Sequence, residues 1–202
     1  MNNVEWTPEW LAETIKLLRT HGSDTQFIEV KKAHGGYPGS LDATLSSFSN
    51  SSTGGIIICG LDENNDFAPV GVYDPADLEK TLGNKLRRGL KPPNTMESGT
   101  ILYEDAKIFV AAIPPLPPYE RPAYIGGKAY VRSGDGDHEM SRHETDLMVA
   151  QRTRTGFDEE PVEYTSLTDL DEGLKTAYLR DVRAKSRRLA TSSDEEVLRR
   201  KG

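Results

Sequence analysis

Residues 23–65, SDTQFIEVKKAHGGYPGSLDATLSSFSNSSTGGIIICGLDENN, form the stretch that decides the fold. The pattern predicts a short strand at 27–33, a Gly-rich bend, a helix from Ser40 and a second strand at 55–61. The second strand contains the run IIIC, which is apolar on both faces. Such a run is typical of a central strand that is covered on both sides.

Four charged residues in this stretch are candidates for one site. Side chains alternate along a strand, so we expect Glu29 and Lys31 on the same side of the first strand. Asp24 lies just before this strand, and Asp62 begins the acidic turn after the second one. The four side chains converge if the two strands pair. The alternative is that Glu29 and Lys31 form ion pairs while Asp62 serves the turn.

Composition limits the class of protein. The chain has 202 residues, 36% of them hydrophobic, and a net charge of -7, which indicates a polar globular protein with one core of about 150 residues plus extensions. No apolar run approaches the ~18 residues that span a bilayer, and the N-terminus has no signal pattern. We therefore expect a cytoplasmic protein with no membrane partner. Cys59, the single cysteine, is expected to be buried and inert.

Charge is unevenly distributed along the chain. Residues 80–132 contain nine Lys or Arg and four Asp or Glu, whereas 158–172 contain seven Asp or Glu and no Lys or Arg. The net charge argues against a protein that binds nucleic acid over its whole surface, but a basic middle segment fits a local anionic ligand. Ordinary clustering of charges on a solvated surface is the alternative explanation.

The remaining elements follow from capping and turn residues. Thr7 and Pro8 predict the start of a helix that ends at Gly22, and a later helix should run from Asp74-Pro75 to Gly89. Further segments are expected as a strand at 68–73, hairpins at 100–113 and 123–132 (the second turning at Gly126-Gly127), a loop at 133–138 and a helix at 141–152. The predicted fold class is α/β (α+β): a mixed, largely antiparallel sheet flanked by helices, with a helical C-terminal extension.

These elements suggest three regions. Residues 1–23 form a helix that packs on the core, 24–152 form the main domain, and 153–202 form an acidic linker and helices. Asp169 or Asp171 should cap one helix of this extension, and Ser193 should begin another. The extension is expected to lead to a C-terminal domain that is missing here and would be a partner in the same protein.

The order of motifs resembles the AlbA-type domain of the Schlafen group over roughly residues 24–151. The resemblance rests on FIEVKKA, the helix ending in Phe-x-Asn, the Gly-Gly strand with its Gly-x-Asp turn, and Arg-Pro followed by Tyr-x-Arg-Ser-Gly. It implies a nucleic-acid-binding, chiefly DNA-binding, module of bacterial transcriptional regulators, including helicase-like and "divergent AAA" proteins. The chain has no Walker-type phosphate loop, so its residues do not support ATP as a cofactor.

The resemblance also implies an enzymatic alternative. Some Schlafen proteins cleave structured RNA with three carboxylates, to which Asp24, Glu29 and Asp62 correspond here, although Asp24 stands where Glu is usual. Carboxylates at convergent positions bind Mg²⁺ or Mn²⁺, and such an ion could activate water and stabilise charge on the scissile phosphate. Asp24, Glu29 and Asp62 would then be catalytic metal ligands of a metal-dependent endoribonuclease.

The nucleic-acid-binding interpretation depends on basic residues. Nine of them are candidates for phosphate contacts: Lys31, Lys32, Arg87, Arg88, Lys91, Arg121, Lys128, Arg132 and Arg142. Such contacts give affinity for DNA or RNA without sequence readout. Arg87 and Arg88 would also suit a helix C-terminus, and the alternative for Arg132 is an internal salt bridge with Glu29. A third interpretation is a dimerisation or interaction domain, with a homodimer as the expected partner.

Overall fold

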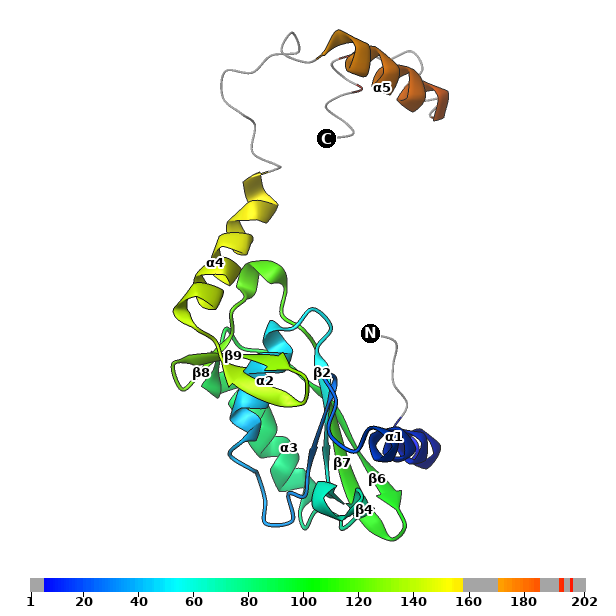
Figure 1. Ribbon diagram of the computed structural model, residues 1–202, viewed down its shortest axis with the longest axis vertical. Coiled ribbons are helices and arrows are strands. Elements are labelled where there is room, and N and C mark those ends of the chain that lie inside the picture. Colours follow the sequence, from blue (N-terminus) through cyan, green and yellow to red (C-terminus); the bar gives the residue numbers. More distant parts are fainter. Residues whose placement is uncertain (1–5, 158–170, 186–192, 195–196, 198–202) are drawn as a thin grey trace. The chain divides into compact units, whose positions relative to one another are not determined.

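A four-stranded main sheet contains both strands predicted in the stretch at 23–65 (Figure 1). The computed structural model describes residues 6–157, 171–185, 193–194 and 197. The strands of the main sheet lie side by side in the order β1 (Ile28–Lys31), β2 (Gly55–Cys59), β7 (Ala106–Ile113) and β6 (Glu97–Tyr103). β1 is parallel to β2 and the other neighbours are antiparallel. The predicted mixed and largely antiparallel sheet is confirmed.

In the described part of the chain, five helices accompany this sheet in the sequence, and the first three pack on its faces. They are α1 (Pro8–His21), α2 (Leu41–Asn50), α3 (Pro75–Asn84), α4 (Arg142–Phe157) and α5 (Glu172–Lys185). Among the described residues, no helix is long and apolar enough to cross a membrane.

The main sheet has an apolar core on each face. On one face Val30 and Ile58 pack with the buried side of α1, including Leu11. On the other face the core contains Ile57 and Cys59 of β2 together with leucines and phenylalanines of α2, α3 and β7. The IIIC strand is therefore covered on both sides, as its apolar pattern predicted.

The ends of α1 follow the sequence, whereas the start of α2 does not. Thr7 accepts a hydrogen bond from the Trp10 amide through Oγ1 at 3.2 Å, and Gly22 ends α1 in the left-handed conformation (φ 77°). Ser40 was expected to cap α2, but it makes no side-chain cap bond. Its backbone already has helical dihedrals (φ -62°, ψ -25°), so the chain turns before the position where a cap residue would lie.

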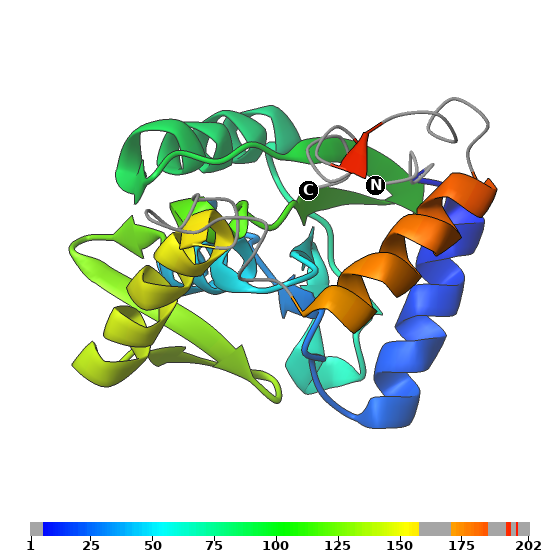
Figure 2. The ribbon, with the colours of Figure 1, turned by 90° about the horizontal axis from the view of Figure 1, so that it is seen from above.

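A second sheet lies beside α2, as both views of the fold show (Figures 1 and 2). Its strands follow the order β10 (Gly136–Glu139), β9 (Lys128–Ser133), β8 (Tyr124–Ile125) and β5 (Leu90–Lys91). The predicted hairpin at Gly126-Gly127 is confirmed by the pairing of Ile125 with Lys128. The loop predicted at 133–138 is wrong, because β10 forms there. Its turn-forming residues gain backbone partners on β9, which a local pattern does not reveal.

Short elements connect the longer strands and helices. These are β3 (Leu61–Asp62), η1 (Glu63–Asn65), β4 (Ala68–Pro69), a π-helical turn η2 (Lys85–Gly89) and η3 (Pro118–Glu120). The strand predicted at 68–73 ends early, because Gly71 adopts a positive φ of 71° and bends the chain. The helix predicted to reach Gly89 changes from α-helical to π-helical geometry after Asn84.

The chain divides into two units, Met1–Thr153 and Arg154–Gly202. In the second unit, Oδ1 of Asp171 accepts a hydrogen bond from the Leu174 amide at 2.9 Å, as expected for the cap of α5. Most of the predicted acidic connector at 158–172, and most of the helix predicted from Ser193, lie outside the described residues.

Candidate functional site

The polar side of α2 is buried rather than solvated. Thr44, Ser46, Ser47, Ser49 and Asn50 are all at most 3% exposed. The second sheet covers most of them, because α2 packs against β8, β9 and β10, while Ser49 donates to the Leu45 carbonyl and accepts from the side-chain amide of Asn94. Buried hydroxyl and amide groups need hydrogen-bond partners, and this helix finds them in the neighbouring strands.

Two of these side chains bond to the backbone of the second sheet. Ser46 donates to the Ala123 carbonyl at 2.7 Å and accepts from the Tyr130 amide at 2.9 Å. Asn50 accepts from the Ala123 amide at 2.6 Å and donates to the carbonyls of Ala123 and Tyr130 at 3.2 and 3.0 Å. The two side chains thus serve as the hydrogen-bonding partners that another strand would otherwise supply.

Two other side chains of α2 position an acidic residue of β10. Thr44 and Ser47 donate to the two carboxylate oxygens of Asp137 at 2.7 and 2.6 Å. Asp137 in turn lies 3.2 Å from Nη1 of Arg132 on β9. The sequence placed Asp137 in a loop, so its contribution was missed. The pattern that could have indicated this contact is the run of small polar residues in the helix. Such a run suits a helix that packs against a polar group.

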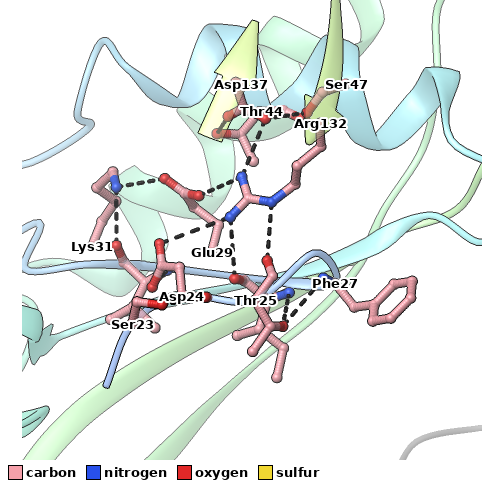
Figure 3. A network of polar contacts seen from close by, with 12 residues as sticks. Ser23, Asp24, Thr25, Phe27, Glu29, Lys31, Thr44, Ser47, Arg132 and Asp137 are labelled. Atoms are coloured by element: carbon pink, nitrogen blue, oxygen red, sulfur yellow. Dashed lines mark hydrogen bonds and ion pairs between the residues drawn. The ribbon is translucent and has the colours of Figure 1, made fainter. Parts of the chain in front are cut away.

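Arg132 reaches from the second sheet to the region around β1 (Figure 3). Its side chain is 2% exposed, and Nη1 lies 2.7 Å from Oε2 of Glu29. Nε donates to the Thr25 carbonyl at 3.0 Å and Nη2 to the Ile28 carbonyl at 3.4 Å. An arginine that contacts phosphate needs an accessible guanidinium, and this one is buried; its geometry matches the alternative expectation of an internal salt bridge with Glu29.

Glu29 and Lys31 lie on the same face of β1, as the period of two predicted. Nζ of Lys31 is 2.5 Å from Oε1 of Glu29, and the register places the two residues opposite Ile57 and Cys59 of β2. Burial alone would lower the pKa of Lys31, but the hydrogen bond and charge of Glu29 outweigh it, so the pKa is raised. Lys31 is therefore held in its charged form by Glu29.

Asp24 lies before β1 and is 7% exposed. Both of its carboxylate oxygens accept from the Val30 amide at 3.1 Å. Burial, reinforced by the negative charge of Glu29, raises the pKa of Asp24 to about 7, and the Val30 hydrogen bond and the charge of Lys31 oppose the rise only in part. Near neutral pH the Asp24 carboxyl therefore takes up and releases a proton as the pH changes.

Asp62 takes a different partner from the other two predicted carboxylates. Its Oδ2 lies 2.6 Å from Nζ of Lys32, in a pair whose lysine side chain is 57% exposed. Asp24 and Glu29 instead face Arg132. Among the described residues, no three Asp, Glu, His or Cys side chains are placed to hold a metal ion. The arrangement does not fit the predicted Mg²⁺ or Mn²⁺ site, and no catalytic step through a metal follows from it.

Three of the predicted basic residues remain accessible at the end of α3. Arg87 and Arg88 lie in the π-helical turn η2 and Lys91 follows in β5; all three are exposed. Within the described part of the chain, none of them forms an ion pair of 4.0 Å or less. Lys91 is opposite Tyr124 in the pairing of β5 with β8, so these bases lie at the outer strand of the second sheet.

The remaining predicted bases each have an internal contact. Lys128 pairs with Glu139 at 2.6 Å, and Arg142 lies 3.8 Å from Asp146 on the surface of α4. Arg121 is half-buried and donates from Nε to the Leu116 carbonyl at 2.7 Å. Burial lowers the pKa of Arg121 from its ordinary value. These bases are less free to contact a phosphate than those of η2 and β5.

Comparisons with solved structures show which folds this one resembles. The fold resembles the solution structure of the N-terminal domain of a RecG-related protein from Nitrosomonas europaea (TM-score 0.50, 23% identity, 65% of this chain and 94% of that one). The DIP2311 protein from Corynebacterium diphtheriae is similar over 95% of this chain and 42% of its own, with 16% identity and a TM-score of 0.47. No curated protein matches the sequence.

Residues 24–141 match the family described as Schlafen, AlbA_2, which is more than half of the chain. The protein belongs to this family. The match begins at Asp24 and ends just after β10, so it contains the main sheet from β1, α2, and the hairpin that carries Arg132. The resemblance inferred from the motifs is thereby confirmed.

Proposed function

We propose that this chain is a nucleic-acid-binding module, chiefly DNA-binding, of a bacterial regulatory protein. The observation that carries the proposal is the exposed basic segment of Arg87, Arg88 and Lys91, which has no ion-pair partner among the described residues. Exposed bases that lack an internal acid are free to exchange counterions for phosphates. π-helical turns such as η2 also occur frequently at functional sites.

The chemistry of this segment favours backbone contacts over base readout. The chain has a net charge of -7, so its attraction for a polyanion has to be local. Arginine and lysine contacts with phosphates position a protein on nucleic acid without reading its sequence. Tyr124, which is opposite Lys91 in the β5–β8 pair, adds an aromatic residue that can stack on a base at this edge of the second sheet.

The family of this chain and the name of a structurally similar protein support the same proposal. The chain is a Schlafen AlbA_2 domain, and the similar domain from Nitrosomonas europaea comes from a protein whose name relates it to an ATP-dependent DNA helicase. A role on DNA for the present chain is consistent with that name.

A salt titration of binding tests the proposal. Fluorescence anisotropy with a labelled duplex and a labelled single strand should give an affinity that falls steeply with salt. The double variant Arg87→Ser/Arg88→Ser should lower the slope of log K against log salt by about 2, because each lost phosphate contact removes close to one unit. The matched control is Lys16→Ser/Lys107→Ser, which changes the net charge equally at two other exposed bases. Equal loss in both variants, or binding that does not depend on salt, would sink the proposal.

A second candidate function is self-association through the main sheet. β6 is an edge strand of seven residues, paired only with β7 in the described sheet, and Leu102 on it is 64% exposed. Exposed edge strands are templates for pairing with another chain. Light scattering should show a dimer that Leu102→Lys converts to a monomer, with Lys16→Leu as a surface control. A monomer at all concentrations would remove this candidate.

A further inference from the structure

Three carboxylates surround one guanidinium in the interior of the domain. They belong to Asp24, Glu29 and Asp137, and we call them the carboxylate cluster. Nη1 of Arg132 lies 2.7 Å from Oε2 of Glu29 and 3.2 Å from Oδ1 of Asp137, and Nη2 lies 3.9 Å from Oδ2 of Asp24. Two carboxylates therefore face a single point, and a nitrogen atom of the protein occupies it (Figure 3).

The guanidinium is fixed in this place by contacts other than the acids. Its remaining N–H groups donate to the carbonyls of Thr25 and Ile28, and its carbon lies 5.3 Å from the centre of the Phe48 ring. The side chain is 2% exposed, and an arginine is not deprotonated in proteins. The cluster thus contains a permanent positive charge held from several directions.

This arrangement leaves no position for a divalent ion. Mg²⁺ and Mn²⁺ take oxygen ligands at about 2.0–2.2 Å and prefer several at once. Glu29 and Asp137 cannot direct oxygens to such an ion while Nη1 lies between them. Lys31 supplies a second positive charge 2.5 Å from Glu29, so the charges of the acids are already largely balanced.

We propose that the guanidinium of Arg132 is the built-in cation of the carboxylate cluster, and that the cluster takes up no divalent metal while Arg132 is in place. Asp24 and Glu29 then hold the β9–β10 hairpin against β1 instead of activating water. Cleavage of a phosphodiester through a metal at these two acids would first require Arg132 to leave. The proposal is independent of nucleic-acid binding at Arg87 and Arg88, which lie on other elements.

Paramagnetic broadening by Mn²⁺ tests the proposal on the wild-type chain. In amide spectra recorded during a Mn²⁺ titration, the signals of Val30, Lys31 and Arg132 should broaden no more than those of core amides at the opposite edge of the main sheet, such as Ile101 on β6. Selective loss of the first three signals, abolished in Glu29→Gln, would show that the cluster binds the ion and would overturn the proposal.

A substitution of the arginine tests the cause. Arg132→Ser frees the point shared by Glu29 and Asp137, so it should gain selective Mn²⁺ broadening at Val30 and Lys31. Lys32→Ser removes a lysine from an exposed pair with Asp62 and should not. If Arg132→Ser folds and gains no broadening, Arg132 is not the group that excludes the metal. If it does not fold, the wild-type titration alone decides.

Discussion

Nη1 of Arg132 lies 2.7 Å from Oε2 of Glu29, and this ion pair joins two sheets that share no strand. Arg132 belongs to β9 of the second sheet and Glu29 to β1 of the main sheet. Both side chains are buried, at 2% and 7% exposure. The contact therefore forms only when the two sheets are packed together, and its loss should weaken that packing.

Removing one partner of this pair should destabilise the fold strongly. Glu29→Gln leaves the guanidinium of Arg132 without its nearest carboxylate in a buried site. Because Asp137 still pairs with Nη1, we expect a loss at the lower end of the roughly 3–5 kcal/mol for a buried charge left unpaired. The free energy of unfolding in urea measures it. Glu139→Gln is the matched control, since it makes the same chemical change in the exposed Lys128–Glu139 pair and should have little measurable effect. Similar stability of the two variants would contradict the structural role of Glu29.

Stability should fall with rising pH because of Asp24. Its folded-state pKa of about 7 lies above the ordinary 3.8, so between these values the native state holds a proton that the unfolded chain has released. The contribution of this proton to the free energy of unfolding is complete below pH 3.8 and is lost as the pH rises toward 7. The free energy of unfolding falls by at most about 1.4 kcal/mol per pH unit over this range.

The variant Asp24→Asn isolates this contribution, because an amide oxygen still accepts from the Val30 amide while no proton is exchanged. Unfolding by urea at several pH values between 4 and 8 measures it. Relative to the wild type, the variant should become progressively more stable as the pH rises. A constant difference between the two proteins over this range would show that Asp24 has an ordinary pKa in the fold.

Hydrogen exchange should reveal the role of α2 in holding the second sheet. Asn50→Ala removes the acceptor of the Ala123 amide and the donor to two carbonyls. We expect a loss of about 2–3 kcal/mol and faster exchange of the Ala123 amide. Ser52→Ala, at an exposed position just beyond the helix, should change neither. Unchanged protection of Ala123 in Asn50→Ala would mean that the hairpin is held by other contacts.

The Gly-Gly motif before β2 should tolerate no side chain at its first position. A Cβ at Gly54 would lie 2.2 Å from the Ile113 carbonyl oxygen, and φ is +78°. Gly36 has a similar conformation (φ +103°) with nothing within 4 Å. Gly36→Ala should therefore cost about 1–2 kcal/mol from backbone strain alone, and Gly54→Ala distinctly more. Thermal unfolding measures both; equal losses would show that the carbonyl moves away at little cost.

The sequence predicted the elements whose signals are local. The apolar run of β2, the turn at Gly126-Gly127 and the limits of α1 each depend on neighbouring residues, and all three were confirmed. The face shared by Glu29 and Lys31 also follows from a single strand. Local periodicity is sufficient for these features because backbone geometry sets them.

The part that could not be predicted depends on packing between distant segments. Thr44 and Ser47 have the spacing of a solvated helix face, and only the approach of β10 brings Asp137 to them. The convergence of Asp24, Glu29 and Asp62 was expected from strand pairing alone. The salt bridge of Arg132 with Glu29 was expected only as the alternative to a phosphate contact. The pairing of Lys32 with Asp62 is set by side-chain contacts that no spacing encodes.

The use of Ser46 and Asn50 as substitutes for a strand partner has an evolutionary consequence. Because Ser46 and Asn50 of α2 bond to the backbone at Ala123, just before β8, and at Tyr130 of β9, outward side chains of these strands can be exchanged without loss of those bonds. A lineage could thus retune which ligands the second sheet prefers by surface substitutions alone, while the scaffold beneath stays the same.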